Sequence, residues 1–218
     1  MKIIVTTSDA YHHVLPTFFY LFNKYWPGQE IELLGYKEPK KIPGGMPNNC
    51  KFVSMGEQGP KEEWSTDLRS YFELQDEFFI WMMEDTFIKR PVNLQQMNFA
   101  YALCYPTIGR IDLTKDVQKR EHMVTKEGVV YAHPKARYRL STQPSIWNRD
   151  FLLTYLHEGM DPWTFETQDP KDDWNIVGLL EYPVIHNEGV RKHNIQELNY
   201  DGISPEDLIN ITWEENSI

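Results

Sequence analysis

The sequence predicts an α/β protein in which a central mixed, mostly parallel sheet is flanked by helices, with a smaller antiparallel second half. Residues 78–83 are continuously apolar, rich in aromatic side chains and too short for a core helix, so they predict a buried central strand. The chain also opens with a strand, a helix and a second strand, a unit that favours parallel pairing. In an open sheet of this kind, ligands bind outside the carboxyl ends of the strands.

The first half of the chain alternates strands with helices. Residues 2–7 are rich in β-branched side chains and predict the first strand. Apolar residues recur at helical spacing from 14 to 25, and Pro27-Gly28 ends that helix. Further strands are expected at 31–36 and 51–55, and further helices at 64–72 and from Pro91, the last with Leu94, Met97, Tyr101 and Cys104 on its buried side.

The second half contains short strands and one charged stretch. Strands are expected at 107–113, 129–133 and 182–185. Residues 115–127 are highly charged and predict a solvated loop or helix face. We expect this half to be more antiparallel than the first.

The second half also carries signals for helix starts. Asn148 suits an N-cap, and Asp161-Pro162 suits an N-cap followed by the first helical residue. A last short helix is expected to start at Ser204. The helix after Asp161 would carry one acidic stripe, formed by Glu166, Asp169 and Asp173.

Composition and charge narrow the class of protein. A chain of 218 residues suits one domain with a sizeable core, and we predict a single domain. The net charge of -10 argues against a nucleic-acid partner, because binding phosphates along a groove needs a basic surface. No apolar stretch is long enough to span a bilayer. Residues 1–15 are too polar for a signal peptide and the chain has only two cysteines, which favours a cytoplasmic location.

Two carboxylates follow the predicted central strand directly. Glu84 and Asp85 come at its carboxyl end, where they would face a crevice. Hard cations such as Mg²⁺ and Mn²⁺ prefer carboxylate oxygens and often bridge to the phosphates of a substrate. The alternative is an ordinary solvated turn at the end of a strand.

A polar turn follows the first predicted strand. Thr7, Ser8, Asp9 and Tyr11 offer hydroxyl groups, one acid and one aromatic ring, and such groups can hold a nucleotide base and ribose. The turn has no glycine fingerprint, which counts against a dinucleotide fold of the usual type. The alternative is an N-cap by Ser8 or Asp9 with no ligand.

Taken together, these segments resemble those of a known family. In addition to residues 6–9 and Glu84-Asp85, the resemblance rests on 141–147 (STQPSIW) and 162–166 (PWTFE), in that order along the chain. The chain resembles glycosyltransferases of the GT-A fold, a Rossmann-like fold, and is similar to small viral enzymes that decorate capsid proteins, such as those of chloroviruses. If the family's Asp-x-Asp motif begins at Glu84, Thr86 stands in place of its second acid; if it begins at Met83, the first acid is missing.

The resemblance implies a nucleotide-diphosphate sugar donor, with UDP favoured, and Mn²⁺ or Mg²⁺ on its phosphates. Asp85 would be the metal ligand, and Glu84 would lie against the ribose or a metal-bound water. His186 stands where several families of this fold have a further ligand, although a buried or capping histidine is the alternative. The family also implies a nucleotide-binding half (1–105) and an acceptor-binding half (106–218).

The reaction implied by the resemblance places demands on further residues. Negative charge grows on the leaving diphosphate, and Arg191 and Lys192 in a loop hinged at Gly189 would stabilise it; the alternative is a basic surface turn. The acceptor hydroxyl needs a positioned base, for which Glu166 is the candidate, giving inversion; the alternative is an acid that stabilises a helix N-terminus. Further contacts to the donor are assigned to Trp64, Arg69 and Gln143.

Three functions therefore compete. The first is a metal-assisted glycosyltransferase acting on a glycan or glycoprotein, in the host cytoplasm if the protein is viral. The second is a sugar-1-phosphate nucleotidyltransferase, which usually has a glycine-rich and basic phosphate loop after its first strand. The third is a catalytically inactive relative that binds carbohydrate or nucleotide.

Overall fold

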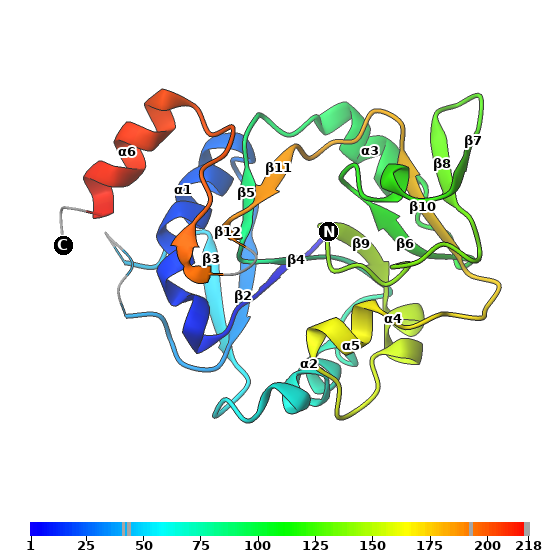
Figure 1. Cartoon of the computed structure of the whole chain (residues 1–218), viewed down its shortest axis with the longest axis horizontal. Helices are drawn as coiled ribbons and strands as arrows, with labels where there is room; N and C mark the ends of the chain where they lie inside the picture. Colours follow the sequence, from blue (N-terminus) through cyan, green and yellow to red (C-terminus); the bar gives the residue numbers. More distant parts are fainter. Residues whose placement is uncertain (41, 43–44, 192–193, 216–218) are drawn as a thin grey trace. The chain divides into compact units, whose positions relative to one another are not determined.

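The computed structural model describes residues 1–40, 42, 45–191 and 194–215. The chain forms two compact units that interleave along the sequence. Unit 1 contains Met1 and residues 59–81 and 93–183, and unit 2 contains residues 2–58, 82–92 and 184–218. Each unit mixes strands with helices (Figure 1). The predicted α/β class is therefore confirmed.

Unit 2 is built on a parallel arrangement of the strands predicted at the start of the chain. β1 (Ile3–Thr6), β2 (Ile31–Gly35) and β3 (Cys50–Ser54) lie in the order β3-β2-β1, with Ile31 opposite both Ile3 and Cys50. α1 (Leu15–Tyr25) connects β1 to β2 after a 3-10 helix, η1 (Asp9–Val14). The apolar face of α1 is buried, as its helical spacing predicts, so the strand–helix–strand opening is confirmed.

The end of the chain in unit 2 packs on α1. α6 (Pro205–Glu215) lies beside α1 in Figure 1. Its Asp207 is buried and accepts hydrogen bonds from the hydroxyls of Tyr20 (3.0 Å) and Tyr25 (2.5 Å) and from Lys24 Nζ (2.7 Å). Burial alone would raise the pKa of Asp207, but these hydrogen bonds and one from Ser204 outweigh it and lower the pKa.

The remaining strands of unit 2 form two antiparallel pairs. β5 (Thr86–Ile88) pairs with β11 (His186–Glu188), and β12 (Val190–Arg191) pairs with β13 (Asn194–Leu198). The strand predicted at 182–185 is wrong, because pairing begins only at His186. The late strand of the sequence is therefore shifted along the chain.

Unit 1 contains a mixed sheet. β4 (Phe78–Met83), whose last two residues belong to unit 2, is followed in the sheet by β9 (Ser145–Asn148), β6 (Ile108–Asp112), β10 (Asn175–Leu179), β8 (Val129–Ala132) and β7 (His122–Val124). β6 and β10 are parallel, and the other neighbouring pairs from β4 to β7 are antiparallel. The antiparallel character predicted for the second half is confirmed.

An aromatic cluster holds the helices of unit 1 against this sheet. α2 (Trp64–Phe72), α4 (Arg149–Tyr155) and α5 (Pro162–Glu166) each contribute rings. Phe72 stacks on Phe79 with the ring centroids 5.1 Å apart, and Trp81 lies 5.5 Å from Trp147. As predicted, the side chains of Asn148 and Asp161 accept hydrogen bonds from the first turns of α4 and α5.

Two helix predictions for unit 1 are wrong. α3 (Leu94–Ala102) is capped by Asn93 rather than opened by Pro91, and Leu94 is 61% exposed instead of buried. α5 ends at Glu166, so Asp169 and Asp173 lie beyond the helix and form no stripe with it. In both cases the capping geometry fixes a helix shorter than the sequence pattern suggested.

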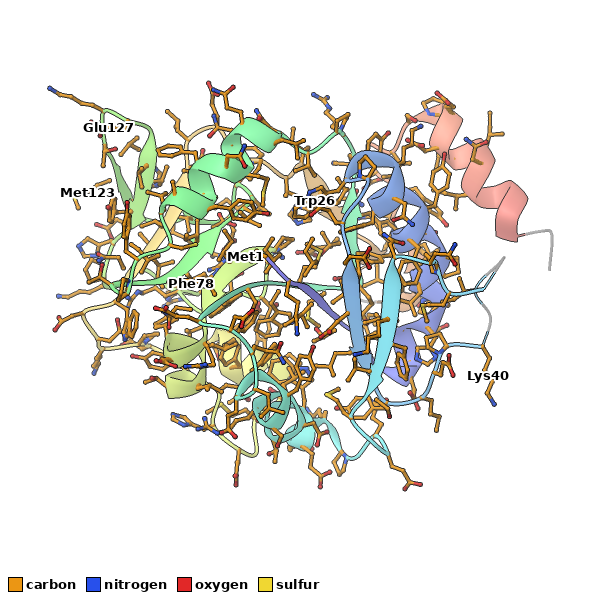
Figure 2. All side chains as sticks on the ribbon, turned by 180° about the vertical axis from the view of Figure 1, so that it is seen from behind. Met1, Trp26, Lys40, Phe78, Met123 and Glu127 are labelled. Atoms are coloured by element: carbon orange, nitrogen blue, oxygen red, sulfur yellow. The ribbon has the colours of Figure 1, made fainter. Side chains whose placement is uncertain are left out.

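The charged stretch 115–127 forms more structure than a loop. It contains the 3-10 helix η3 (Val117–Lys119) and strand β7, which pairs with β8 in a hairpin. Met123 and Glu127 project from this hairpin in Figure 2, and Met123 is 66% exposed. The strand was not predicted because the stretch 115–127 is highly charged and no side chain of β7 is buried.

We predict that Asp207→Asn lowers the free energy of unfolding by about 1.5–3 kcal/mol at pH 7, because the buried acceptor loses its charge. Since the folded pKa is lowered, the stabilisation is present above the ordinary pKa near 3.8 and is lost as the pH falls through the folded value. Urea denaturation at pH 7 and pH 3 measures both effects. The adjacent, exposed Glu206→Gln variant is the control, and equal stability of the two variants at pH 7 would contradict the assignment.

Candidate active site

The two acids predicted after the central strand differ in environment. Glu84 is only 3% exposed, whereas Asp85 is half-buried. The Glu84 N–H donates to the Thr6 carbonyl (3.2 Å), and the Thr7 hydroxyl donates to Glu84 Oε1 (3.3 Å). The turn after β4 is thereby joined to the end of β1. The structure thus brings the predicted site residues Thr7, Glu84 and Asp85 together at the ends of two strands.

The carboxyl group of Glu84 has a raised pKa in this turn. Burial is the largest cause that raises the pKa of Glu84, the negative charge of Asp85 raises it further, and the result is about 8. Hydrogen bonds from Thr7 and from the backbone offset only part of this. The pKa of Tyr11 is also raised, by burial first and then by Glu84 and Asp85. Tyr11 therefore lies within electrostatic reach of both acids.

A glycine allows the close approach that this turn requires. A Cβ added to Gly35, at the end of β2, would lie 2.8 Å from Thr7 Cγ2. A larger residue at position 35 would therefore displace the Thr7 side chain. The Thr7 hydroxyl is thus positioned by a neighbouring strand as well as by its own.

Asp9 is held by residues that the sequence analysis did not single out. Its carboxylate accepts a hydrogen bond from the Lys37 N–H (3.1 Å) and forms an ion pair with Lys37 Nζ (3.1 Å), while its N–H donates to Gln58 Oε1 (3.0 Å). Burial alone would raise the pKa of Asp9, but Lys37 and His12 outweigh it and lower the pKa. Lys37 follows the end of β2, next to β1, so the shared sheet edge was the signal that could have found it.

The η1 start combines predicted site residues with a structural role. Ser8 occupies the N-cap position of η1 in an extended conformation, but its side chain makes no capping hydrogen bond. Its carbonyl accepts a hydrogen bond from the Tyr11 N–H (2.9 Å). Ser8 therefore stands at the N-cap position, as the alternative predicted, but its hydroxyl does not cap the helix.

The loop that follows β11 lies against Asp85. The Gly189 N–H donates to the Asp85 carbonyl (2.5 Å), and a Cβ on Gly189 would come within 2.9 Å of that oxygen. Arg191 forms an ion pair with Glu197 (2.8 Å) and lies 3.8 Å from Asp201, so a phosphate would have to compete with these acids. Lys192 lies outside the described residues.

The described part of the chain holds no cluster of three or more His, Cys, Asp or Glu side chains that could hold a metal ion. A cation beside the acid pair would relieve the repulsion between Glu84 and Asp85, which is one cause of the raised pKa of Glu84. Mg²⁺ is commonly bound by one or two carboxylates together with substrate phosphates and water. His186 is half-buried and pairs with Ile88, three residues beyond Asp85.

In unit 1, the predicted base is fixed by a residue that we did not predict. Glu166 Oε1 accepts hydrogen bonds from both the N–H and the hydroxyl of Thr142, each at 2.6 Å. Thr142 lies in the segment 141–147 that carried part of the resemblance. The carboxylate at the end of α5 is therefore held in one orientation.

The other predicted donor contacts in unit 1 have structural partners. Trp64 packs on Trp81 (centroids 6.1 Å apart) and Phe165 (6.0 Å). Arg69 donates to the carbonyls of Leu153 (2.6 Å) and Leu156 (3.0 Å), which ties α2 to α4. The Gln143 carbonyl accepts a hydrogen bond from the Ser145 hydroxyl (2.7 Å). These residues lie in unit 1, whereas Thr7, Glu84, Asp85 and Arg191 lie in unit 2.

Comparison with known proteins gives structural likeness only. No family model matches the chain, and no curated protein matches it. The structure is similar to 4-diphosphocytidyl-2C-methyl-D-erythritol synthase from Anaerococcus prevotii DSM 20548, at 11% identity and a TM-score of 0.42 over 99% of this chain and 95% of that one. It is also similar to the galactosyltransferase LgtC in complex with donor and acceptor sugar analogues, at 10% identity and a TM-score of 0.40 over 71% of this chain and 60% of that one. Because both scores are below 0.5, we build the function on the chain's own residues.

We predict that the stability of the protein falls between about pH 5 and pH 8 because of Glu84. The folded pKa of about 8 exceeds the ordinary value of 4.5, so the stabilisation is complete below the ordinary value and is lost as the pH rises through the folded value. The slope is at most about 1.4 kcal/mol per pH unit. Chemical denaturation at unit steps from pH 5 to 9 measures it.

Two variants separate Glu84 from the other titrating groups. Glu84→Gln cannot ionise and should flatten this part of the profile, whereas the exposed Glu30→Gln should leave it unchanged. A Glu84→Gln protein with the wild-type slope would show that Glu84 is ionised in the folded state at neutral pH.

Proposed function

We propose that the protein is a glycosyltransferase that moves a sugar from a nucleotide-diphosphate sugar, with UDP favoured, to a hydroxyl group of a glycan or glycoprotein. The observation that carries the proposal is the acid pair at the end of β4, with Glu84 buried against Thr7 and Asp85 half-buried beside it. Burying a carboxyl group next to another acid costs free energy, and such arrangements concentrate at functional sites.

The polar turn of unit 2 would hold the nucleotide. We assign the base and ribose to Thr7, Ser8, Asp9 and Tyr11, which offer hydroxyl groups and one aromatic ring. Lys37 holds the carboxylate of Asp9 and Gln58 holds its N–H, so this acid has a fixed position. The half-exposed Tyr11 ring lies in the field of the two acids, close to where a diphosphate would be neutralised by a cation.

A divalent cation, Mn²⁺ or Mg²⁺, would be held by Asp85 and, in our assignment, by His186. Its chemistry would be to stabilise the negative charge that develops on the leaving diphosphate. Arg191 would also stabilise this charge, after exchanging its ion pair with Glu197 for one with phosphate oxygens. The same role for Lys192 stays a prediction.

The transfer step needs a base in unit 1. Both hydrogen bonds from Thr142 go to Oε1 of Glu166, and we assign acceptance of the proton from the acceptor hydroxyl to Oε2. Attack by that hydroxyl on the face opposite the leaving diphosphate would invert the anomeric carbon. The contacts of Trp64, Arg69 and Gln143 with the donor stay a prediction.

Two other functions compete with this one, and one assay separates all three. A glycosyltransferase releases nucleoside diphosphate slowly from its donor with water as the acceptor. A sugar-1-phosphate nucleotidyltransferase releases pyrophosphate from a nucleoside triphosphate and a sugar 1-phosphate. An inactive binding relative releases neither product.

The setting of the proposed activity is also a prediction. In the described ranges, no helix has the length and apolar character needed to cross a bilayer. Cys50 and Cys104 are free thiols. We propose a cytoplasmic enzyme, in a host cell if the protein is viral.

We predict that Asp85→Asn weakens the affinity for UDP in the presence of Mn²⁺ by at least about tenfold. Partners of metal ligands alone are worth about 10- to 100-fold in metal affinity, and Asp85 would be a direct ligand. A thermal-shift titration detects this, because UDP at a hundred times its Kd adds about 2.7 kcal/mol to the stability. Glu30→Gln is the control, and unchanged affinity of Asp85→Asn would remove the basis of the proposal.

We predict that Glu166→Gln lowers the rate of UDP release from a panel of UDP-hexoses by about 10²- to 10⁴-fold, the usual contribution of a general base. Its affinity for UDP should stay unchanged. The exposed Glu158→Gln, which lies in the same unit, is the control. A Glu166→Gln protein with full turnover would mean that another group accepts the proton.

A further inference from the structure

An exposed tryptophan stands on the helix that carries Glu166. Trp163 is 60% exposed, although tryptophan is usually well covered in a folded protein. It lies in the first turn of α5, three residues before Glu166, so both side chains lie on one side of the helix. The ring of Tyr138 meets it edge to face with the centroids 6.3 Å apart.

Tyr138 is held in a strained conformation. Its φ is 57°, and among the described residues Tyr138 is the one non-glycine residue with a positive φ. A bulky side chain adopts this conformation at a cost in free energy. Arg120 lies 4.7 Å from the centroid of the Tyr138 ring and forms an ion pair with Asp116 (2.8 Å). The surrounding structure thus holds the ring beside Trp163 against its backbone preference.

The next residue anchors this strained segment from inside. Arg139 is buried, and it donates hydrogen bonds to Asp172 (3.1 Å) and to the carbonyls of Pro170 (2.9 Å) and Trp174 (2.7 Å). This network fixes the backbone at position 138. Strain that is held in place by buried contacts is a feature of binding sites.

A polar cavity adjoins Tyr138, whose ring in turn meets the ring of Trp163. Its volume is about 450 Å³, and it is lined by Lys135, Arg137, Tyr138, Thr167, Gln168 and Asp169. The lining combines positive, negative, amide and hydroxyl groups. A ligand with only one sign of charge would meet repulsion from part of this lining, whereas sugar hydroxyl groups both donate and accept hydrogen bonds.

We infer that Trp163, Tyr138 and this cavity form a subsite for a pyranose ring of a neutral oligosaccharide. The apolar face of the sugar would stack on the exposed indole, and its hydroxyl groups would bond to the cavity lining. Because Trp163 and Glu166 share one side of α5, a sugar bound there would extend towards the carboxylate that Thr142 orients. Naming this sugar the acceptor rests on the proposed function, but the sugar binding itself does not.

Saturation-transfer NMR with the full chain tests the subsite, using the methyl glycosides of glucose, galactose, mannose, rhamnose and xylose as probes without any nucleotide. We expect at least one glycoside to bind with a Kd that Trp163→Ala raises at least tenfold. Tyr138→Gly should weaken the binding of the same glycoside; glycine at this position accepts a φ of 57° without strain. Trp163→Phe, which keeps an aromatic face, should bind within a few-fold of the wild type.

The control is Tyr105→Ala, which removes another exposed aromatic ring of unit 1 away from the cavity lining. It should bind the glycoside as the wild type does. Equal weakening by Tyr105→Ala, wild-type binding by Trp163→Ala, or a lack of binding by every glycoside would each overturn the inference. Melting temperatures establish that the variants fold, since the exposed Trp163 ring contributes little to the core.

One more variant separates this inference from the proposed function. Asp85→Asn should bind the glycosides like the wild type, because Asp85 is not among the residues that line the cavity. If Asp85→Asn leaves the affinity for UDP unchanged while Trp163→Ala abolishes glycoside binding, the donor site is wrong and the sugar subsite stands. The reverse result would leave the donor site standing and remove the subsite.

Discussion

The turn after β4 depends on the burial of one carboxyl group. Glu84 is almost fully enclosed next to Asp85, so the fold must keep it protonated, hydrogen-bonded or beside a cation. Thr7 supplies one hydrogen bond, and Gly35 leaves the space that Thr7 needs. The end of β1 and the turn at Glu84-Asp85 are therefore positioned together by the need to satisfy this buried carboxyl group.

The predictable parts of the fold are the buried elements, because their apolar residues form a continuous run or recur at a regular spacing. β4 and α1 were found because almost every apolar residue in them is covered. β7 was missed because its residues are all exposed, and β5 because a strand of three residues is too short to show a period. The acidic stripe failed for another reason: the spacing was helical, but α5 ends before it can place Asp169 beside Glu166.

The candidate site shows a similar limit. The positions of Glu84, Asp85 and Thr7 were predictable because they follow the ends of β4 and β1, and the ends of neighbouring strands meet. Lys37 and Thr142 were missed because their partners, Asp9 and Glu166, are distant in the sequence, and a single chain carries no local sign of such contacts. Gly189 was predicted as a hinge, yet its lack of a side chain already serves a close approach to Asp85.

The interleaving of the two units has a consequence for synthesis on the ribosome. All of unit 1 has been translated when residue 183 is added, but unit 2 still lacks residues 184–218. At about 5–20 residues per second, these emerge roughly 2–7 s later. During that interval β5 lacks its partner strand and α1 lacks Asp207, so nascent unit 2 has to wait, half-assembled, for the final segment. A premature stop codon at position 184 or shortly after it would therefore spare every segment of unit 1 while leaving unit 2 permanently incomplete.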